Sequence, residues 1–141
     1  MGAQPSIRVL QVLLGAAVAV SVVHYVDNTL RWDDFVAADP ADRSLSFIAR
    51  WTIPVAWVAF TACAVMAYRR FQEQRWAPAA AWLGAYSGSG LVGLGHYLDL
   101  SPSDLDPFQN AHVMIDIALG AAILVYAVRL SLRAPYLEPE D

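Results

Sequence analysis

This sequence has a single cysteine and no lysine. The scarcity of cysteine excludes a class of chemistry. Cys63 is the only cysteine, so the chain has no intramolecular disulfide and no CxxC redox or metal motif. All nine basic residues are arginines. The sequence also lacks a glycine-rich phosphate loop, a GxSxG elbow and a Cys/His nucleophilic arrangement. Nothing in it indicates a nucleic-acid partner.

Charge is scarce and apolar residues are abundant. Charged residues make up 16% of the chain and hydrophobic residues 57%, whereas an average soluble domain has about 25% charged residues. Four segments approach the roughly 20 apolar residues that a membrane-spanning helix needs, and helices satisfy their own backbone in lipid. The sequence therefore predicts one all-α domain over residues 1–141, an integral membrane four-helix bundle. The expected helices cover about 7–28, 47–70, 76–98 and 107–132, and an outer loop covers 29–46.

The arginines predict how this bundle is oriented. One set of helix ends carries six arginines and the other carries three. The first set is Arg8, Arg69, Arg70, Arg75, Arg129 and Arg133, and the second is Arg31, Arg43 and Arg50. Because cytoplasmic ends are enriched in basic residues, both termini are expected in the cytoplasm, with the protein multi-pass in the cell membrane and its acidic loops outside.

Small residues crowd the third segment, which contains the run GAYSGSGLVGLG. Gly84 and Gly88 form a GxxxG spacing that lets helix backbones approach closely, and Gly120 lies in the fourth segment. The third segment is therefore expected at the centre of a tight bundle. The alternative is that the small residues leave room for a flat ligand such as a lipid chain, a quinone or a porphyrin.

The three histidines of the chain fall at the same predicted end of the bundle. HYVD at 24–27 and HYLD at 96–99 end the first and third segments, and this repeat indicates either an internal duplication or convergence on the same chemistry. Each histidine has an aspartate three or four residues further on, a spacing that puts both side chains on one helix face. The three pairs are His24 with Asp27, His96 with Asp99, and His112 with Asp116.

Asp116 is the most informative of these residues. The fourth segment reaches spanning length only if Asp116 lies inside it, roughly 10 Å or more beyond the helix start. A carboxylate at such a depth generally faces the bundle interior and marks a functional site. His112, one turn away, is its expected partner on the same helix.

The leading hypothesis is a divalent metal site, for instance for Zn²⁺. The aspartates would be further ligands or would orient the imidazoles, and Asp116 is the candidate catalytic general base in the hydrolysis of a lipid or another hydrophobic substrate. The predicted metal set is His24, His96, His112, Asp27, Asp99 and Asp116.

Two alternatives stay open. In one, the protein is a non-enzymatic subunit of a membrane complex, or a lipid-binding protein, and the cluster is structural. In the other, two histidines hold a haem b for electron transfer. The expected partners are membrane lipids, a hydrophobic substrate, and a second copy of the chain or another subunit.

Overall fold

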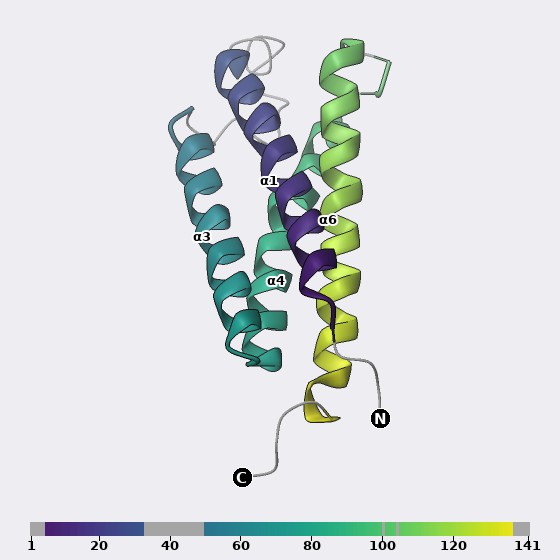
Figure 1. Cartoon of the computed structure of the whole chain (residues 1–141). Helices are drawn as coiled ribbons and strands as arrows, with labels where there is room; N and C mark the ends of the chain where they lie inside the picture. Colours follow the sequence, from purple (N-terminus) through teal and green to yellow (C-terminus); the bar gives the residue numbers. More distant parts are fainter. Residues whose placement is uncertain (1–4, 33–49, 100, 104, 137–141) are drawn as a thin grey trace.

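Most of the described part of the chain is helical, and it contains no strand. The computed structural model describes residues 5–32, 50–99, 101–103 and 105–136, without the side chains of Asp99 and Tyr136. Its main helices are α1 (Ile7–Leu30), α3 (Thr52–Gln72), α4 (Trp76–Leu91) and α6 (Pro107–Arg133). Short 3-10 and α-helical turns, Val92–Gly95 and α5 (His96–Asp99), continue α4, and a 3-10 turn at Ala134–Tyr136 follows α6. The predicted all-α class is confirmed (Figure 1).

Local sequence signals set the ends of these helices. Asp106 caps α6, because its side chain accepts hydrogen bonds from the backbone N–H groups of Phe108 and Gln109, both at 3.0 Å. Pro107 fills the first position of α6, where a missing N–H costs little. Between α3 and α4 the chain reverses at Gln74, whose φ of 58° is left-handed. This tight link makes α3 and α4 antiparallel neighbours.

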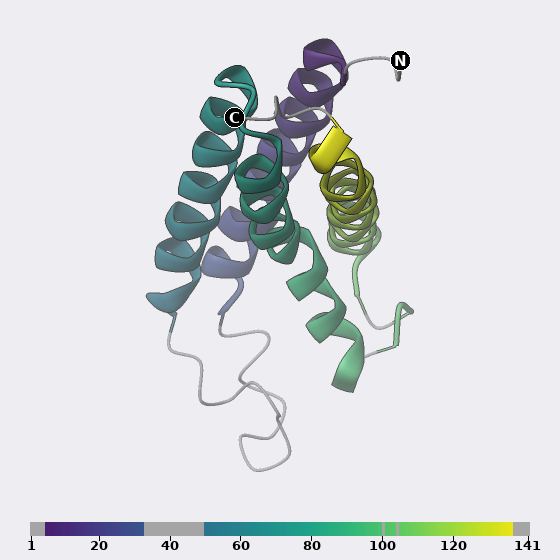
Figure 2. The ribbon, with the colours of Figure 1, turned by 90° about the horizontal axis from the view of Figure 1, so that it is seen from below.

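The four main helices form a ring. α4 packs against α3 on one side and against α6 on the other, and α1 packs against the same two helices from across the bundle. α1 and α4 have few contacts with one another. Figure 2, a view from below, shows α6 nearly end-on and α4 between α3 and α6. Side chains from α1 and α6 therefore meet along one long antiparallel interface.

The backbones of α4 and α6 touch at Gly90 and Gly120. A Cβ atom on Gly90 would overlap the carbonyl oxygen of Asp116, and one on Gly120 would lie 2.9 Å from the carbonyl oxygen of Ser87. The GxxxG pair predicted for this role is less close: Gly88 faces the ring of Phe60 on α3, and nothing lies within 4 Å of a Cβ on Gly84. Tight packing of this helix occurs as expected, but at a different glycine.

The predicted helix at 76–98 is helical over that span but changes from α to 3-10 geometry after Leu91. α4 has 16 residues, which at about 1.5 Å per residue is roughly 24 Å, shorter than the ~30 Å hydrocarbon core. Gly93 and Gly95, both poor helix formers, lie in the 3-10 turn that follows it. In the described residues, α1, α3 and α6 are the three helices long and apolar enough to cross a membrane.

The other predicted boundaries are close to those found. α1 ends two residues after the predicted 7–28, and α6 ends one residue after the predicted 107–132. α3 begins at Thr52. The predicted start of that helix at residue 47, and the outer loop from residue 33 onward, lie outside the described residues.

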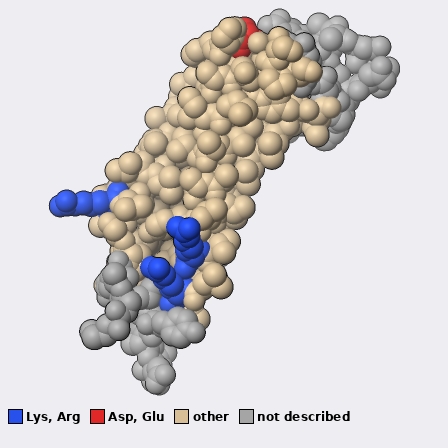
Figure 3. Space-filling model, turned by 90° about the vertical axis from the view of Figure 1, so that its right-hand side faces the viewer, with Lys and Arg blue, Asp and Glu red and all other residues tan. Residues whose placement is uncertain are grey.

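The outside of the bundle is apolar along its whole length. Val12 and Leu132, near one end, are 73% and 71% exposed, and Val58 is 60% exposed. The side shown in Figure 3 has arginines towards one end, an acidic residue at the other, and a broad uncharged surface between them. Such a surface matches the hydrocarbon region of a bilayer better than it matches water.

Candidate functional site

The most deeply buried ion pair among the described residues joins α1 to α6. His24 Nδ1 lies 2.6 Å from Asp116 Oδ2, and only 1% of His24 and 2% of Asp116 is exposed. With the proton on His24 Nδ1, the ring N–H donates to the Asp116 carboxylate. Asp116 faces the bundle interior, as the sequence predicts. Its partner, however, is His24 on α1 rather than His112 on its own helix.

A second histidine–aspartate contact lies one helical turn closer to the end of the bundle where α1 finishes and α6 begins. His112 Nε2 of α6 donates to Asp27 Oδ2 of α1 over 3.2 Å. The two helices exchange partners because they are antiparallel: the step from His24 to Asp27 along α1 leads towards the same end as the step from Asp116 to His112 along α6. The result is two level crossbridges, each with one imidazole and one carboxylate.

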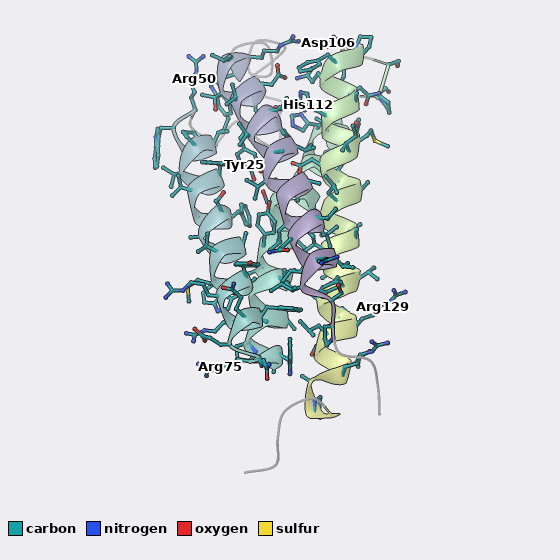
Figure 4. The ribbon with its side chains drawn as sticks, in the orientation of Figure 1. Tyr25, Arg50, Arg75, Asp106, His112 and Arg129 are labelled. Carbon is teal, nitrogen blue, oxygen red and sulfur yellow. The ribbon has the colours of Figure 1, made fainter. Side chains whose placement is uncertain are left out.

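Arg31 extends this network to the surface. Its Nε lies 3.1 Å from Asp27 Oδ1, one turn away on α1, and its Nη1 forms an ion pair with Asp106 at the start of α6. The pKa of Asp106 lies below its usual value because the carboxylate accepts the Gln109 backbone N–H and faces the Arg31 guanidinium. Figure 4 places Asp106 and His112 at the same end as Arg50, opposite Arg75 and Arg129.

His96 reaches the cluster from α5. Its Nε2 lies 3.2 Å from His24 Nε2 and 3.1 Å from Asn28 Nδ2. The 3-10 turn before it passes so close to α1 that a Cβ atom on Gly93 would lie 3.2 Å from His24 Cε1. The break after α4 therefore brings the third imidazole beside the first, as the ring separation of 5.3 Å confirms.

The hydrogen-bonding roles around His24 and His96 depend on the imidazole tautomers and on the orientation of the Asn28 amide. With one proton between the two Nε2 atoms, one imidazole donates to the other, and a donating His96 Nε2 is matched by the Asn28 amide oxygen. With no proton there, both Nε2 atoms present lone pairs to the same space.

The predicted metal ligands come together only in part. Across the described residues, no three His, Cys, Asp or Glu side chains converge as a metal centre requires. Asp27 and Asp116 each lie within hydrogen-bonding distance of an imidazole nitrogen, which is the geometry that the predicted orienting role requires. The side chain of Asp99 lies outside the described part of the chain. The atoms that do converge are the two imidazole nitrogens and the Asn28 amide.

Two contributors to the cluster were not predicted. Arg31 is four residues after Asp27, a spacing that predicts an ion pair on one helix face, so its role could have been recognised. Gly93 gave no such signal, because its importance depends on how closely α1 approaches. Tyr97, which donates to Asn110 Oδ1 over 2.6 Å, joins α5 to α6 beside the cluster.

Comparison with known proteins adds no assignment to this geometry. No protein-family model, no curated protein and no solved structure matches the chain. Function has to be inferred from the arrangement of the side chains.

Proposed function

We propose that the protein is inserted in a membrane and binds a divalent transition-metal ion, such as Zn²⁺, through His24 Nε2 and His96 Nε2. The observation that carries this proposal is the 3.2 Å separation of these two nitrogens. Imidazole nitrogens bind Zn²⁺ at about 2.0–2.1 Å in tetrahedral geometry, which sets two such ligands roughly 3.3 Å apart. The pair already has the spacing of two ligands on one ion.

Asn28 is the best candidate for a third ligand. Its amide nitrogen lies 3.1 Å from His96 Nε2, and its Oδ1 is buried without a hydrogen-bond partner among the described residues. A half-turn of the amide exchanges these two atoms and directs the oxygen to the ion. His112 is the other candidate, because its ring centroid is 5.4 Å from that of His24 and its buried Nδ1 lacks a partner in the described ranges.

Asp116 has a positioning role in this proposal. A metal-binding imidazole usually donates its other N–H to a carboxylate, which fixes the tautomer and strengthens the ligand. His24 does so with Asp116, and His112 with Asp27. Three protein ligands would leave a fourth position for water, which is the arrangement of a hydrolytic zinc site. Hydrolysis of a hydrophobic substrate is therefore an extension of the same proposal.

The haem alternative is less well supported. Two axial histidines lie on opposite faces of a porphyrin, whereas His24 and His96 are in direct contact. Two of the glycines expected to make room for a flat ligand lie against a neighbouring helix instead, Gly88 against Phe60 of α3 and Gly90 against the backbone of α6.

Membrane insertion and its direction rest on the apolar exterior and on the arginines. Six arginines lie at the ends of α1, α3, α4 and α6 that are opposite the histidine cluster. By the positive-inside rule these ends face the cytoplasm and the cluster faces outward. A fluorescent protein fused to the C-terminus should fold and fluoresce in cells, and alkaline phosphatase at the same position should be inactive; the opposite pattern would reverse the orientation.

The metal proposal is tested with cobalt, which reports tetrahedral coordination by its visible absorption. Chelator-stripped protein should give a visible band that saturates at one Co²⁺ per chain and disappears when Zn²⁺ is added. His24→Gln and His96→Gln should lose the band, and Tyr97→Phe, which alters a neighbour outside the cluster, should keep it. A wild-type protein without the band, or glutamine variants that retain it, would leave the cluster purely structural.

A further inference from the structure

The end of the bundle that carries the histidine cluster also has an apolar groove between α1 and α3. It has a volume of about 240 Å³ and is open to the outside. Its walls are almost wholly hydrocarbon. The residues that line it are Val22, Tyr25, Val26, Thr29, Leu30, Pro54 and Trp57.

The inner end of the groove is held by hydrogen bonds. Trp57 Nε1 of α3 donates to Ser21 Oγ of α1 over 3.2 Å, so the indole lies across the gap between the helices. The Tyr25 hydroxyl donates to the carbonyl of Ser89 on α4 over 3.4 Å. With their polar atoms bonded elsewhere, both rings present apolar surface to the groove. The groove is therefore a hydrophobic slot between α1 and α3.

The outer end of the groove carries a positive charge. Arg50 donates from Nε to the Thr29 carbonyl over 2.8 Å and from Nη2 to the Leu30 carbonyl over 3.3 Å. These are two of the residues that line the groove, and their carbonyls end α1, where the helix dipole favours a cation. Figure 4 shows Arg50 at this end of α1 and α3, with Tyr25 deeper between the helices.

Arg50 also lies at the level where a lipid headgroup would be found. The next residue, Trp51, is 66% exposed at the start of α3, and exposed tryptophans of membrane helices gather at the headgroup region. A guanidinium has five N–H donors, of which the two carbonyls use two. It binds phosphate with strong, charge-assisted hydrogen bonds.

We infer that this groove binds one acyl chain of an anionic phospholipid, whose phosphate lies against Arg50. The chain occupies the slot between α1 and α3, and the guanidinium selects a negatively charged headgroup. This inference rests on the membrane insertion proposed above but not on the metal. Tyr25 also contacts His24, with ring centroids 5.6 Å apart, so the lipid would lie one aromatic ring away from the histidine cluster.

The test uses the full chain reconstituted in nanodiscs of equal parts phosphatidylglycerol and phosphatidylcholine, released gently and examined by native mass spectrometry. One phosphatidylglycerol should remain bound, in preference to phosphatidylcholine. Arg50→Gln should reduce that preference about tenfold. Arg129→Gln, at the opposite end, is the matched control and should keep it.

A second pair of variants tests the slot itself. Val26→Trp fills the groove and should lower retention of both lipids, whereas Val12→Trp, on an exposed part of α1 outside the groove, should not. A wild-type chain that keeps no lipid, or keeps both lipids equally, overturns the inference, as does an Arg50→Gln variant with unchanged preference. Incorporation of every variant into the nanodisc is checked first, so a failure of membrane insertion is distinguished from a failure of lipid binding.

Discussion

His24 of α1 and Asp116 of α6 form a 2.6 Å hydrogen bond between two side chains that are both almost completely buried. The residues are 92 positions apart in sequence, so the contact exists only when the first and last helices of the bundle are assembled. It joins the most deeply placed carboxylate to the imidazole at the centre of the cluster. Both the stability of the bundle and the orientation of the His24 ring depend on this hydrogen bond.

Removal of one partner of this pair should be far more costly than removal of both. Asp116→Leu leaves the His24 ring N–H buried without an acceptor and should lower the free energy of unfolding by about 3–5 kcal/mol. His24→Phe combined with Asp116→Leu should recover much of that loss, because two apolar side chains then meet. Thermal unfolding followed by circular dichroism in one detergent measures both. A double variant as unstable as Asp116→Leu would show that the pair is not coupled.

Gly90 should not tolerate even a methyl group. Its added Cβ overlaps the Asp116 carbonyl oxygen on α6, so Gly90→Ala forces α4 and α6 apart and should destabilise the protein by about 1–3 kcal/mol or more. Gly84→Ala is the matched control on the same helix, because nothing lies within 4 Å of its Cβ. It should be neutral or stabilising by up to about 1 kcal/mol. Equal effects of the two substitutions in thermal unfolding would contradict the close approach.

Gly93→Ala should disturb the cluster more than it disturbs the fold. The new Cβ lies 3.2 Å from His24 Cε1 and 3.1 Å from Ile117 Cγ1, so the imidazole has to move by a few tenths of an ångström. Cobalt affinity should fall about tenfold or more, the usual result of misorienting a ligand, while the helical circular dichroism spectrum stays the same. Gly15→Ala, which meets nothing within 4 Å, should leave the affinity unchanged.

Asp106 should stabilise the protein at neutral pH, and this stabilisation should be lost in acid. Its folded-state pKa is lowered below the usual 3.8, so its contribution to stability is fully present above that value and is lost as the pH falls through the folded-state pKa. Asp106→Ser keeps a cap for α6 but does not titrate. Its melting temperature should therefore fall less between pH 5 and 3 than that of the wild type. Parallel pH profiles for the two proteins would assign the acid sensitivity to other groups.

The helices and the depth of the polar residues were predictable from local patterns. Apolar length alone located α1 and α6 to within about two residues. The charge at Asp116 predicted an inward-facing side chain, since a carboxylate in an apolar segment has few other places to go. The common end of the three histidines followed from the alternating direction of successive helices.

The partners of these residues were not predictable in the same way. The spacing of His112 and Asp116 indicates only that they share a helix face; it does not show that His24 of another helix lies nearer. The change of helix type after Leu91 could not be predicted from Gly93 and Gly95, because glycine is common within membrane helices as well as at helix ends. Tertiary contacts with α1 and α6 decide between the two outcomes, and no local pattern records them.

The paired crossbridges between α1 and α6 have a consequence for how the bundle finds a single alignment. Valine, leucine and alanine faces give little axial information, since a helix that slides by one turn, about 5.4 Å, meets nearly the same surface. Such a slide would bring His24 level with His112 and leave Asp116 without its imidazole. Each crossbridge joins one histidine to one aspartate, and the two residue types occur in opposite order on α1 and α6. Only one axial register of the two helices therefore satisfies both crossbridges. The polar residues thereby fix the axial register of α1 against α6 in an otherwise apolar interface, as a buried asparagine does in a coiled coil.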